Sequence, residues 1–253
     1  MHIKVMNSLG DSVYHRPFVR AFASSIDTKW PDLFSDLKFR DFDGEKPRSP
    51  GYTSKNLALC NITRAIGRFF PDPDPFVFDL PEFPKPGGRY AVIRPPTLRR
   101  DFYAPARNPL MEYVSQSVEI LKSRGIETIG VGNIGDNELF HGKHPDVDVE
   151  HWNGLKIPEL MGLLSGAEVI IAGPGYTVPV AMAYKVPHVI IYGGAAKWNR
   201  LAKLTDPRVS HKLAVVEPDD FCRVCPTVEH DCNKTISDFE RKFNNALDRA
   251  MSM

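Results

Sequence analysis

The sequence predicts an α/β protein of two domains, in which a reduced N-terminal domain precedes a domain built on a doubly wound parallel sheet. Two observations lead to this prediction. Short apolar strands alternate with amphipathic helices from residue 90 to residue 192. A proline-rich stretch separates this region from a shorter strand and helix region before it. We therefore expect an N-terminal domain over residues 1–86 and a C-terminal domain over residues 87–253.

The N-terminal domain is predicted to begin with a strand, a loop and a helix. Residues 2–7 form a short strand candidate, and a turn over residues 8–12 leads into apolar positions Phe18, Val19 and Phe22 at helical spacing. Residues 30–51 are charged and broken, whereas residues 54–70 again carry apolar side chains at helical spacing. The domain is therefore expected to be abbreviated.

The segment over residues 70–88 is predicted to be a linker. It contains prolines at positions 71, 73, 75, 81, 84 and 86, and two glycines close it. Proline removes a backbone donor and fixes φ, so neither a continuous helix nor a central strand fits this composition.

The C-terminal domain shows the regular alternation. Strands are expected over residues 90–93, 127–131, 147–149, 169–172 and 188–192, and helices over 109–124, 157–164 and 178–184, with Gly125 ending the first helix. Such alternation favours a parallel sheet, which binds ligands beyond the carboxyl ends of its strands. We therefore look for the binding site in the loops that follow the strands.

Composition excludes several classes of protein. Hydrophobic residues make up 42% of the chain, which is ordinary for a globular protein. Lysine and arginine number 32 against 31 acidic residues, so no global positive field would hold a nucleic acid by charge alone. The N-terminal apolar stretch is too short for a secretory signal, and no run of about 18 apolar residues occurs. We expect a cytoplasmic protein without a transmembrane segment.

Small residues and arginines gather in the loops at the predicted binding edge. A loop between a buried strand and a helix offers backbone N–H groups and a positive helix end to a phosphate; the alternative is an ordinary turn. Arginines after the strand at residue 90 would suit a diphosphate, and the alternative is that solvent covers them. The candidates for nucleotide binding are Gly132, Asn133, Gly173, Gly175, Tyr176, Thr177, Gly193, Arg94, Arg99, Arg100 and Arg107.

Asp11 is the candidate catalytic residue. It lies in the first strand-to-helix loop, where a carboxylate can face the cleft between domains and accept a proton from a hydroxyl group. The alternative is that Asp11 caps the following helix, because Asp and Ser are favoured at that position. His15, four residues later, is either structural or exposed.

Two other groups of residues have metal-binding chemistry. Cys222, Cys225, His230 and Cys232 carry ligand types suited to zinc, but their compact spacing matches no standard finger. Buried free thiols under the C-terminal helix are the alternative, and we assign no metal ligand here. The pair Asp146 and Asp148 suits a metal-dependent transferase or an ordinary polar loop.

Three segments, in order, resemble the heptosyltransferase family of lipopolysaccharide assembly. The first is residues 8–11, Ser-Leu-Gly-Asp, leading to Pro17. The second runs from residue 157 through Gly175 to residue 193, and the third is the cysteine segment over residues 222–232. The matches cover residues 1–20 and about 90–240. The chain departs from the family at Gly173–Pro174–Gly175, where the family has Asp-Ser/Thr-Gly, and near Pro179, where it has a histidine.

The resemblance implies two Rossmann-like domains in the B-type glycosyltransferase fold, here with a reduced N-terminal domain. It also implies a hexosyl- or heptosyltransferase that moves a sugar from a nucleotide-diphosphate donor to a carbohydrate or glycolipid hydroxyl. The reaction would invert the anomeric carbon, with Asp11 as the base and with no metal on the diphosphate or other cofactor. Two alternatives stay open: a bacteriophage-type transferase that acts on a modified nucleic-acid base, and a non-catalytic nucleotide-sugar-binding protein.

Overall fold

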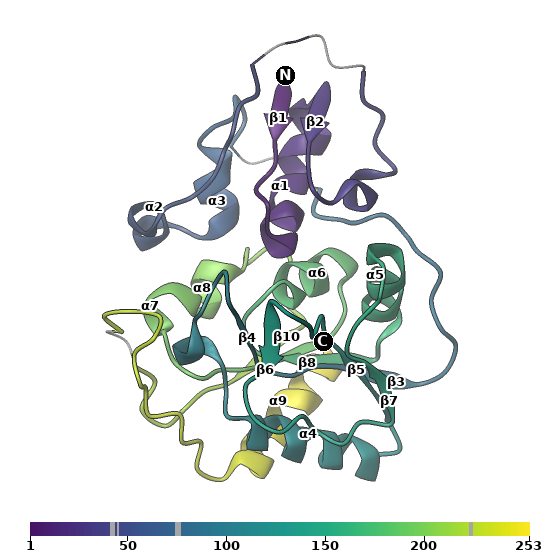
Figure 1. Cartoon of the computed structure of the whole chain (residues 1–253), viewed down its shortest axis with the longest axis vertical. Helices are drawn as coiled ribbons and strands as arrows, with labels where there is room; N and C mark the ends of the chain where they lie inside the picture. Colours follow the sequence, from purple (N-terminus) through teal and green to yellow (C-terminus); the bar gives the residue numbers. More distant parts are fainter. Residues whose placement is uncertain (41–43, 45, 74–76, 223–224) are drawn as a thin grey trace.

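The computed structural model describes residues 1–40, 44, 46–73, 77–222 and 225–253. It has two parts (Figure 1), with a small parallel pair of strands in the first and a six-stranded sheet in the second. Residues 41–43 and 45 of the predicted broken stretch, residues 74–76 of the predicted linker and residues 223–224 of the cysteine segment lie outside the described residues.

The N-terminal part begins with the strand, loop and helix that the sequence predicts. Strands β1 (His2–Lys4) and β2 (Ser25–Asp27) pair in parallel and are joined by helix α1 (Leu9–Phe22). Arg48 adds a short parallel bridge to Ile3 on β1. The 3-10 turn η1 (Pro31–Phe34) follows β2.

The stretch over residues 54–70, whose apolar side chains have helical spacing, is helical in two pieces. The structure has two short helices, α2 (Ser54–Leu59) and α3 (Ile62–Gly67). The break has a local cause, because the Asn61 side chain accepts a hydrogen bond from the amide of Arg64 and so starts a new helix.

The second part confirms the predicted doubly wound parallel sheet. Its strand order is β10-β9-β8-β3-β5-β7, and every neighbouring pair is parallel. The strands are β3 (Tyr90–Arg94), β5 (Glu127–Val131), β7 (Val149–His151), β8 (Val169–Ala172), β9 (His188–Ile191) and β10 (Leu213–Val216). The strand order reverses direction between β3 and β8, which is where such sheets bind ligands.

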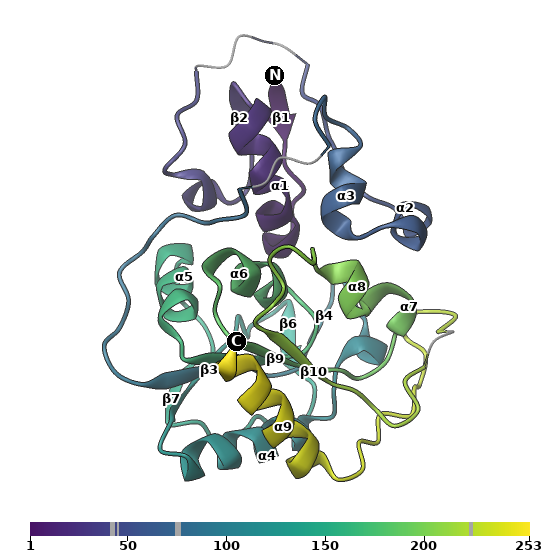
Figure 2. The same ribbon diagram turned by 180° about the vertical axis from the view of Figure 1, so that it is seen from behind.

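Helices cover both faces of this sheet (Figures 1 and 2). Helices α5 (Ile157–Gly166) and α6 (Thr177–Tyr184) lie on the face turned toward the N-terminal part, and α4 (Met111–Ser123) and α9 (Phe239–Ser252) lie on the opposite face. Gly125 follows α4 in the left-handed conformation, with φ +68°, and ends the helix as predicted.

Shorter elements lie around the binding edge. Strands β4 (Thr97–Arg99) and β6 (Glu138–Phe140) form an antiparallel ribbon after β3. A 3-10 turn, η2 (Pro105–Arg107), lies between β4 and β6 in the sequence, and helices α7 (Ala196–Asn199) and α8 (Leu201–Leu204) follow β9. The ribbon, α7, α8 and β2 have only three or four residues each, too few for a periodic sequence pattern, and the apolar strand β10 was not predicted from the sequence.

The two parts of the chain share a continuous apolar core. Helix α1 packs against α6, and the cluster that contains Phe18 also contains Val178 and Tyr192. Burial of this surface stabilises the contact between the parts, at roughly 25 cal/mol per Å² of apolar area.

The described residues of the predicted linker contain no helix or strand, as expected, but they pack tightly. The Tyr184 hydroxyl donates to the Pro81 carbonyl at 2.7 Å, and Phe78 and Leu80 are buried. On the side of the N-terminal part, the fully buried Arg16 of α1 donates to Asp79 of the linker at 3.1 Å and to Asp36 at 2.5 Å. The linker is therefore tied to both parts. Among the described residues, no helix is both long and apolar enough to cross a membrane.

Candidate functional site

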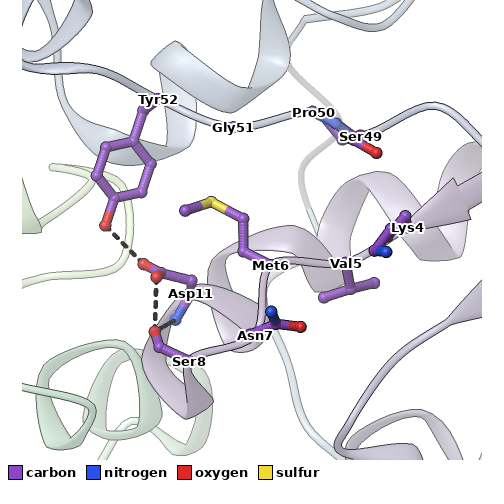
Figure 3. A pocket seen from close by; sticks show the side chains of 10 residues that line it. All are labelled: Lys4, Val5, Met6, Asn7, Ser8, Asp11, Ser49, Pro50, Gly51 and Tyr52. Carbon is purple, nitrogen blue, oxygen red and sulfur yellow. Dashed lines mark hydrogen bonds between the residues drawn. The ribbon is translucent and has the colours of Figure 1, made fainter. Parts of the chain in front are cut away.

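A cavity of about 500 Å³ opens at the carboxyl end of β1 (Figure 3). Asp11 lies in it, on the first turn of α1. The lining residues are Lys4, Val5, Met6, Asn7, Ser8, Asp11, Ser49, Pro50, Gly51 and Tyr52. Two segments that are far apart in the sequence, one from β1 to α1 and one before α2, therefore form its walls.

Asp11 is held by two hydroxyl groups. Ser8 donates to its Oδ2 at 2.6 Å, and Tyr52 donates to its Oδ1 at 2.6 Å. The alternative that Asp11 caps α1 is wrong, because Ser8 is the N-cap and its side chain accepts from the Asp11 amide. The Asp11 carboxylate is therefore oriented by side chains at the edge of an open cavity.

His15 is buried and structural, which settles the two alternatives for this residue. Its Nδ1 lies 2.8 Å from the Asp11 carbonyl oxygen, and its Nε2 lies 3.0 Å from the Pro50 carbonyl oxygen. Burial lowers the pKa of the imidazole, although the two carbonyl groups oppose this effect. His15 thus joins helix α1 to the segment that carries Tyr52.

The loop from β8 to α6 meets the N-terminal end of α1. A Cβ atom placed on Gly10 would lie 3.1 Å from the Cα of Tyr176, so only glycine allows this approach without movement. The positive ends of two helices, α1 and α6, therefore converge beside Asp11. At the start of α6 the Thr177 hydroxyl is buried and has no hydrogen-bond partner among the described residues.

Two of the four predicted arginines contact this loop. Arg107 donates to the Pro174 carbonyl at 2.5 Å, and its guanidinium lies 5.6 Å from the centre of the Phe102 ring. Burial lowers the pKa of Arg107, while Tyr52 and Asp11 act in the opposite direction. The Arg94 guanidinium lies 5.9 Å from the Tyr176 ring centre but is paired with Glu138.

The other predicted nucleotide-binding residues have different surroundings. Arg99 pairs with Asp101 at 2.5 Å, and Arg100 and Asn133 are exposed. Gly132 and Gly193 serve packing, since a Cβ atom on Gly193 would lie 1.9 Å from the Asn108 carbonyl oxygen. Gly175 has open space around it, whereas Gly173 packs closely against Pro109.

The pair Asp146 and Asp148 lies at the wrong edge of the sheet for a diphosphate-bound metal. Asp148 precedes β7 and accepts from the Thr128 amide at 2.9 Å, near the start of β5. This is the amino edge of the parallel strands, opposite the ligand-binding edge. The polar-loop interpretation of this pair therefore holds.

The cysteine segment forms a compact four-residue cluster. The ligand atoms of Cys222, Cys225, His230 and Cys232 all lie within 4.8 Å of one another. The Ala195 amide donates to Cys225 Sγ at 3.1 Å. Cys60 is not part of this cluster, and its thiol donates to the Asn56 carbonyl in α2. The cluster packs behind η2, because the Lys234 ammonium donates to the Pro105 carbonyl and the Val228 carbonyl accepts from the Ala106 amide.

Tyr52 and Phe102 are the site residues that the sequence did not indicate. Tyr52 lies 41 residues from Asp11 in an irregular segment, and Phe102 lies in a loop. Neither carries a motif or a periodic pattern, so only the folded chain brings them to the site.

The sequence matches no protein-family model and no curated protein sequence. Solved structures nevertheless share its fold. TibC, a bacterial iron-containing dodecameric glycosyltransferase from enterotoxigenic E. coli H10407, matches with a TM-score of 0.66 and 16% identity, over 99% of this chain and 76% of that chain. TibC in complex with ADP-D-beta-D-heptose matches with a TM-score of 0.58 and 16% identity, over 99% and 73% of the two chains.

A third structure, E. coli ADP-heptose LPS heptosyltransferase II, matches with a TM-score of 0.55 and 11% identity, over 97% of this chain and 98% of that chain. The chain therefore has the heptosyltransferase-like, B-type glycosyltransferase fold that the sequence predicted.

Proposed function

We propose that this protein is a glycosyltransferase that moves a sugar from a nucleotide-diphosphate donor to an acceptor hydroxyl group. One observation carries the proposal: Asp11 lines a cavity, and the preceding residue, Gly10, approaches Tyr176, so that the positive ends of α1 and α6 meet beside that cavity. A base and an anion-binding site therefore adjoin each other. The fold shared with glycosyltransferases supports the same reading.

The donor diphosphate is proposed to bind between the loop at residues 173–177 and η2. The Thr177 hydroxyl is buried without a hydrogen-bond partner in the described part of the chain, and Gly175 leaves room for a ligand to approach the backbone. Arg107 contacts the same loop and supplies a positive charge. Guanidinium groups and helix N-termini stabilise phosphate charge, so these groups suit a leaving nucleoside diphosphate.

The reaction is proposed to be a direct displacement with inversion. Asp11 takes the proton of the acceptor hydroxyl, whose oxygen forms a bond to the anomeric carbon while the bond from that carbon to the diphosphate oxygen breaks. The nucleoside diphosphate leaves with the bonding electron pair. Arg107 and the two helix ends are proposed to stabilise this charge in place of a metal ion, so omission of Mg²⁺ and Mn²⁺ should leave transfer unchanged.

ADP-heptose is the first donor to test, because TibC has been solved with ADP-D-beta-D-heptose. Donor binding should raise the melting temperature of the protein, since a ligand that binds only the folded state stabilises it. Donors with other sugars and nucleotides are compared in the same assay, and a selective shift identifies the donor class.

Asp11→Asn tests whether the protein catalyses transfer. The variant should retain the donor-induced shift and lose at least about 100-fold of the transfer rate, a typical contribution of a general base. Asp146→Asn is the matched control, because that side chain is 95% exposed and lies far along the chain from the site. Wild-type turnover in Asp11→Asn would refute the role of Asp11. Donor binding without transfer in the wild type would support a non-catalytic binding protein.

We also propose that the cluster of Cys222, Cys225, His230 and Cys232 holds a structural metal ion. Three thiolates and one imidazole are a common tetrahedral donor set for zinc, and thiolates also bind iron. The Ala195 amide donates to Cys225, as expected of a backbone donor that stabilises a metal-bound thiolate. In this position a metal ion would brace η2, which carries Arg107.

Metal analysis of the purified protein tests this second proposal. About one equivalent of zinc or iron is expected, and Cys225→Ser should lose the metal and lower the melting temperature. Cys60→Ser is the control, because this thiol lies outside the cluster. Protein that is metal-free after purification and still folded would contradict the proposal.

A further inference from the structure

We infer that Tyr52 is the positioning residue of the site, which holds the Asp11 carboxylate in the orientation that receives the acceptor proton. This inference rests on the proposed function and assigns a role to a segment that the sequence left without one. It concerns orientation only, because Tyr52 reaches the reaction through Asp11.

The two hydroxyl groups on Asp11 occupy different oxygens. Tyr52 donates to Oδ1 and Ser8 donates to Oδ2, each at 2.6 Å. A carboxylate has about four lone-pair positions, so two remain for an acceptor hydroxyl and a second donor. A carboxylate held at both oxygens cannot turn about its Cβ–Cγ bond without losing a hydrogen bond. The remaining lone pairs therefore keep a fixed direction at the cavity wall (Figure 3).

Tyr52 is suited to act as a permanent donor. Burial raises the pKa of its phenol, and the nearby charge of Asp11 raises it further. The hydroxyl group therefore keeps its proton throughout the working range of an enzyme. A serine or water at this place would have more rotational freedom than a phenol on a rigid ring.

The segment that carries Tyr52 is fixed before any substrate binds. The amide of Lys4 donates to the Arg48 carbonyl at 2.8 Å, which attaches the segment to β1. Two residues later, the Pro50 carbonyl lies 3.0 Å from the Nε2 of His15 on α1. Both anchors lie within four residues of Tyr52, so its ring enters the cavity from a braced backbone.

Other charged or titratable groups also act on this pair. Arg107 on η2 lies within electrostatic reach of Tyr52 and Asp11, and Tyr14 and His15 approach them from α1. None of these three groups donates a hydrogen bond to the Asp11 carboxylate among the contacts of the described residues. The orientation of the carboxylate therefore depends on Tyr52 and Ser8.

Tyr52→Phe removes the hydroxyl group and keeps the ring. We expect kcat to fall about 10- to 100-fold, the range that corresponds to one hydrogen bond to a charged group. The KM for the donor should change less than about twofold, because the Tyr52 hydroxyl donates to Asp11 and makes no hydrogen bond to residues 173–177 among the described residues.

The experiment compares wild type, Tyr52→Phe, Tyr103→Phe and Asp11→Asn, with kcat and donor KM measured from pH 5 to pH 9. Tyr103 is the control, because this tyrosine is half-exposed and does not line the cavity. A loss of kcat with a nearly unchanged donor KM, in Tyr52→Phe alone, would support the inference. If Asp11→Asn is inactive while Tyr52→Phe keeps the wild-type kcat, the inference is overturned and the proposed function stands. If Asp11→Asn stays active, both are overturned.

Discussion

Because of His188, the free energy of unfolding of this protein should decrease strongly at acid pH. This residue begins β9, an inner strand of the sheet between β10 and β8, and its side chain is fully buried with neither ring nitrogen bonded to a described residue. Burial lowers the pKa of the imidazole to about 3 from the ordinary 6.5. Below pH 6.5 the His188 imidazole therefore binds a proton in the unfolded chain but stays neutral in the folded chain, so the free energy of unfolding decreases as the pH falls.

The size of this effect follows from the pKa difference. Each pH unit between the two pKa values costs about 1.4 kcal/mol, so a change from pH 8 to pH 5 removes about 2 kcal/mol of unfolding free energy through this residue. His188→Leu replaces the imidazole with an apolar side chain of similar size. The variant should lose about 2 kcal/mol less than the wild type over this range. It should be no less stable at pH 8, because the unpartnered polar ring is gone.

Urea unfolding at pH 8 and pH 5 measures both quantities, with His211→Leu as the control at an exposed histidine. The control should keep the wild-type acid dependence. Equal losses of stability in the wild type and in His188→Leu, within about 0.5 kcal/mol, would refute the reasoning. A residual dependence is expected in the variant, because burial also lowers the pKa of His15.

Three further substitutions test the packing that forms the site. Gly10→Ala places a methyl group 3.1 Å from the Tyr176 backbone, so it should part α1 from the donor loop and weaken donor binding about tenfold, as measured by calorimetry; unchanged affinity would contradict the proposed junction. Arg16→Met removes the buried donor to Asp36, Asp79 and the Leu33 carbonyl and leaves Arg20 as the partner of both carboxylates, so it should cost about 1.5–3 kcal/mol in urea unfolding, whereas a cost below about 1 kcal/mol would make the network dispensable. Gly162→Ala puts its Cβ atom 2.1 Å from the Pro84 carbonyl and should cost about 1–3 kcal/mol while it loosens the linker, which limited proteolysis would detect as faster cleavage. Wild-type resistance to protease would show that the linker is not held there.

Local patterns predicted the regular elements well. The helix over residues 157–164 and the strand over residues 169–172 agree with α5 and β8 to within two residues, because each has a clear apolar period or run. The apolar spacing over residues 54–70 did not reveal that two helices lie there, because the spacing continues across Asn61, whose side chain starts the second helix. Helical spacing records which side chains can face one way, and it does not record where a polar side chain caps the backbone.

The sequence predicted that the loops after the strands meet, but not which of their residues contact one another. The parallel alternation required the loops after β3 and β8 to meet at one edge, and they do. Which arginine reaches the donor loop depends on pairings that composition does not reveal. Arg94 forms an ion pair with Glu138, and Arg99 forms one with Asp101. Arg107 instead donates a hydrogen bond to the Pro174 carbonyl.

The sequence by itself determined the α/β class, the doubly wound sheet and the edge at which the loops after its strands converge. These features follow from short-range periodicity and from the geometry of parallel strands, which any chain with this pattern must obey. Only the tertiary structure decided that Tyr52 holds Asp11, that Gly10 lets two helix ends converge and that three cysteines and His230 meet behind η2. Those contacts join residues from irregular segments or from separate parts of the chain, and packing in three dimensions sets them because no local pattern encodes them.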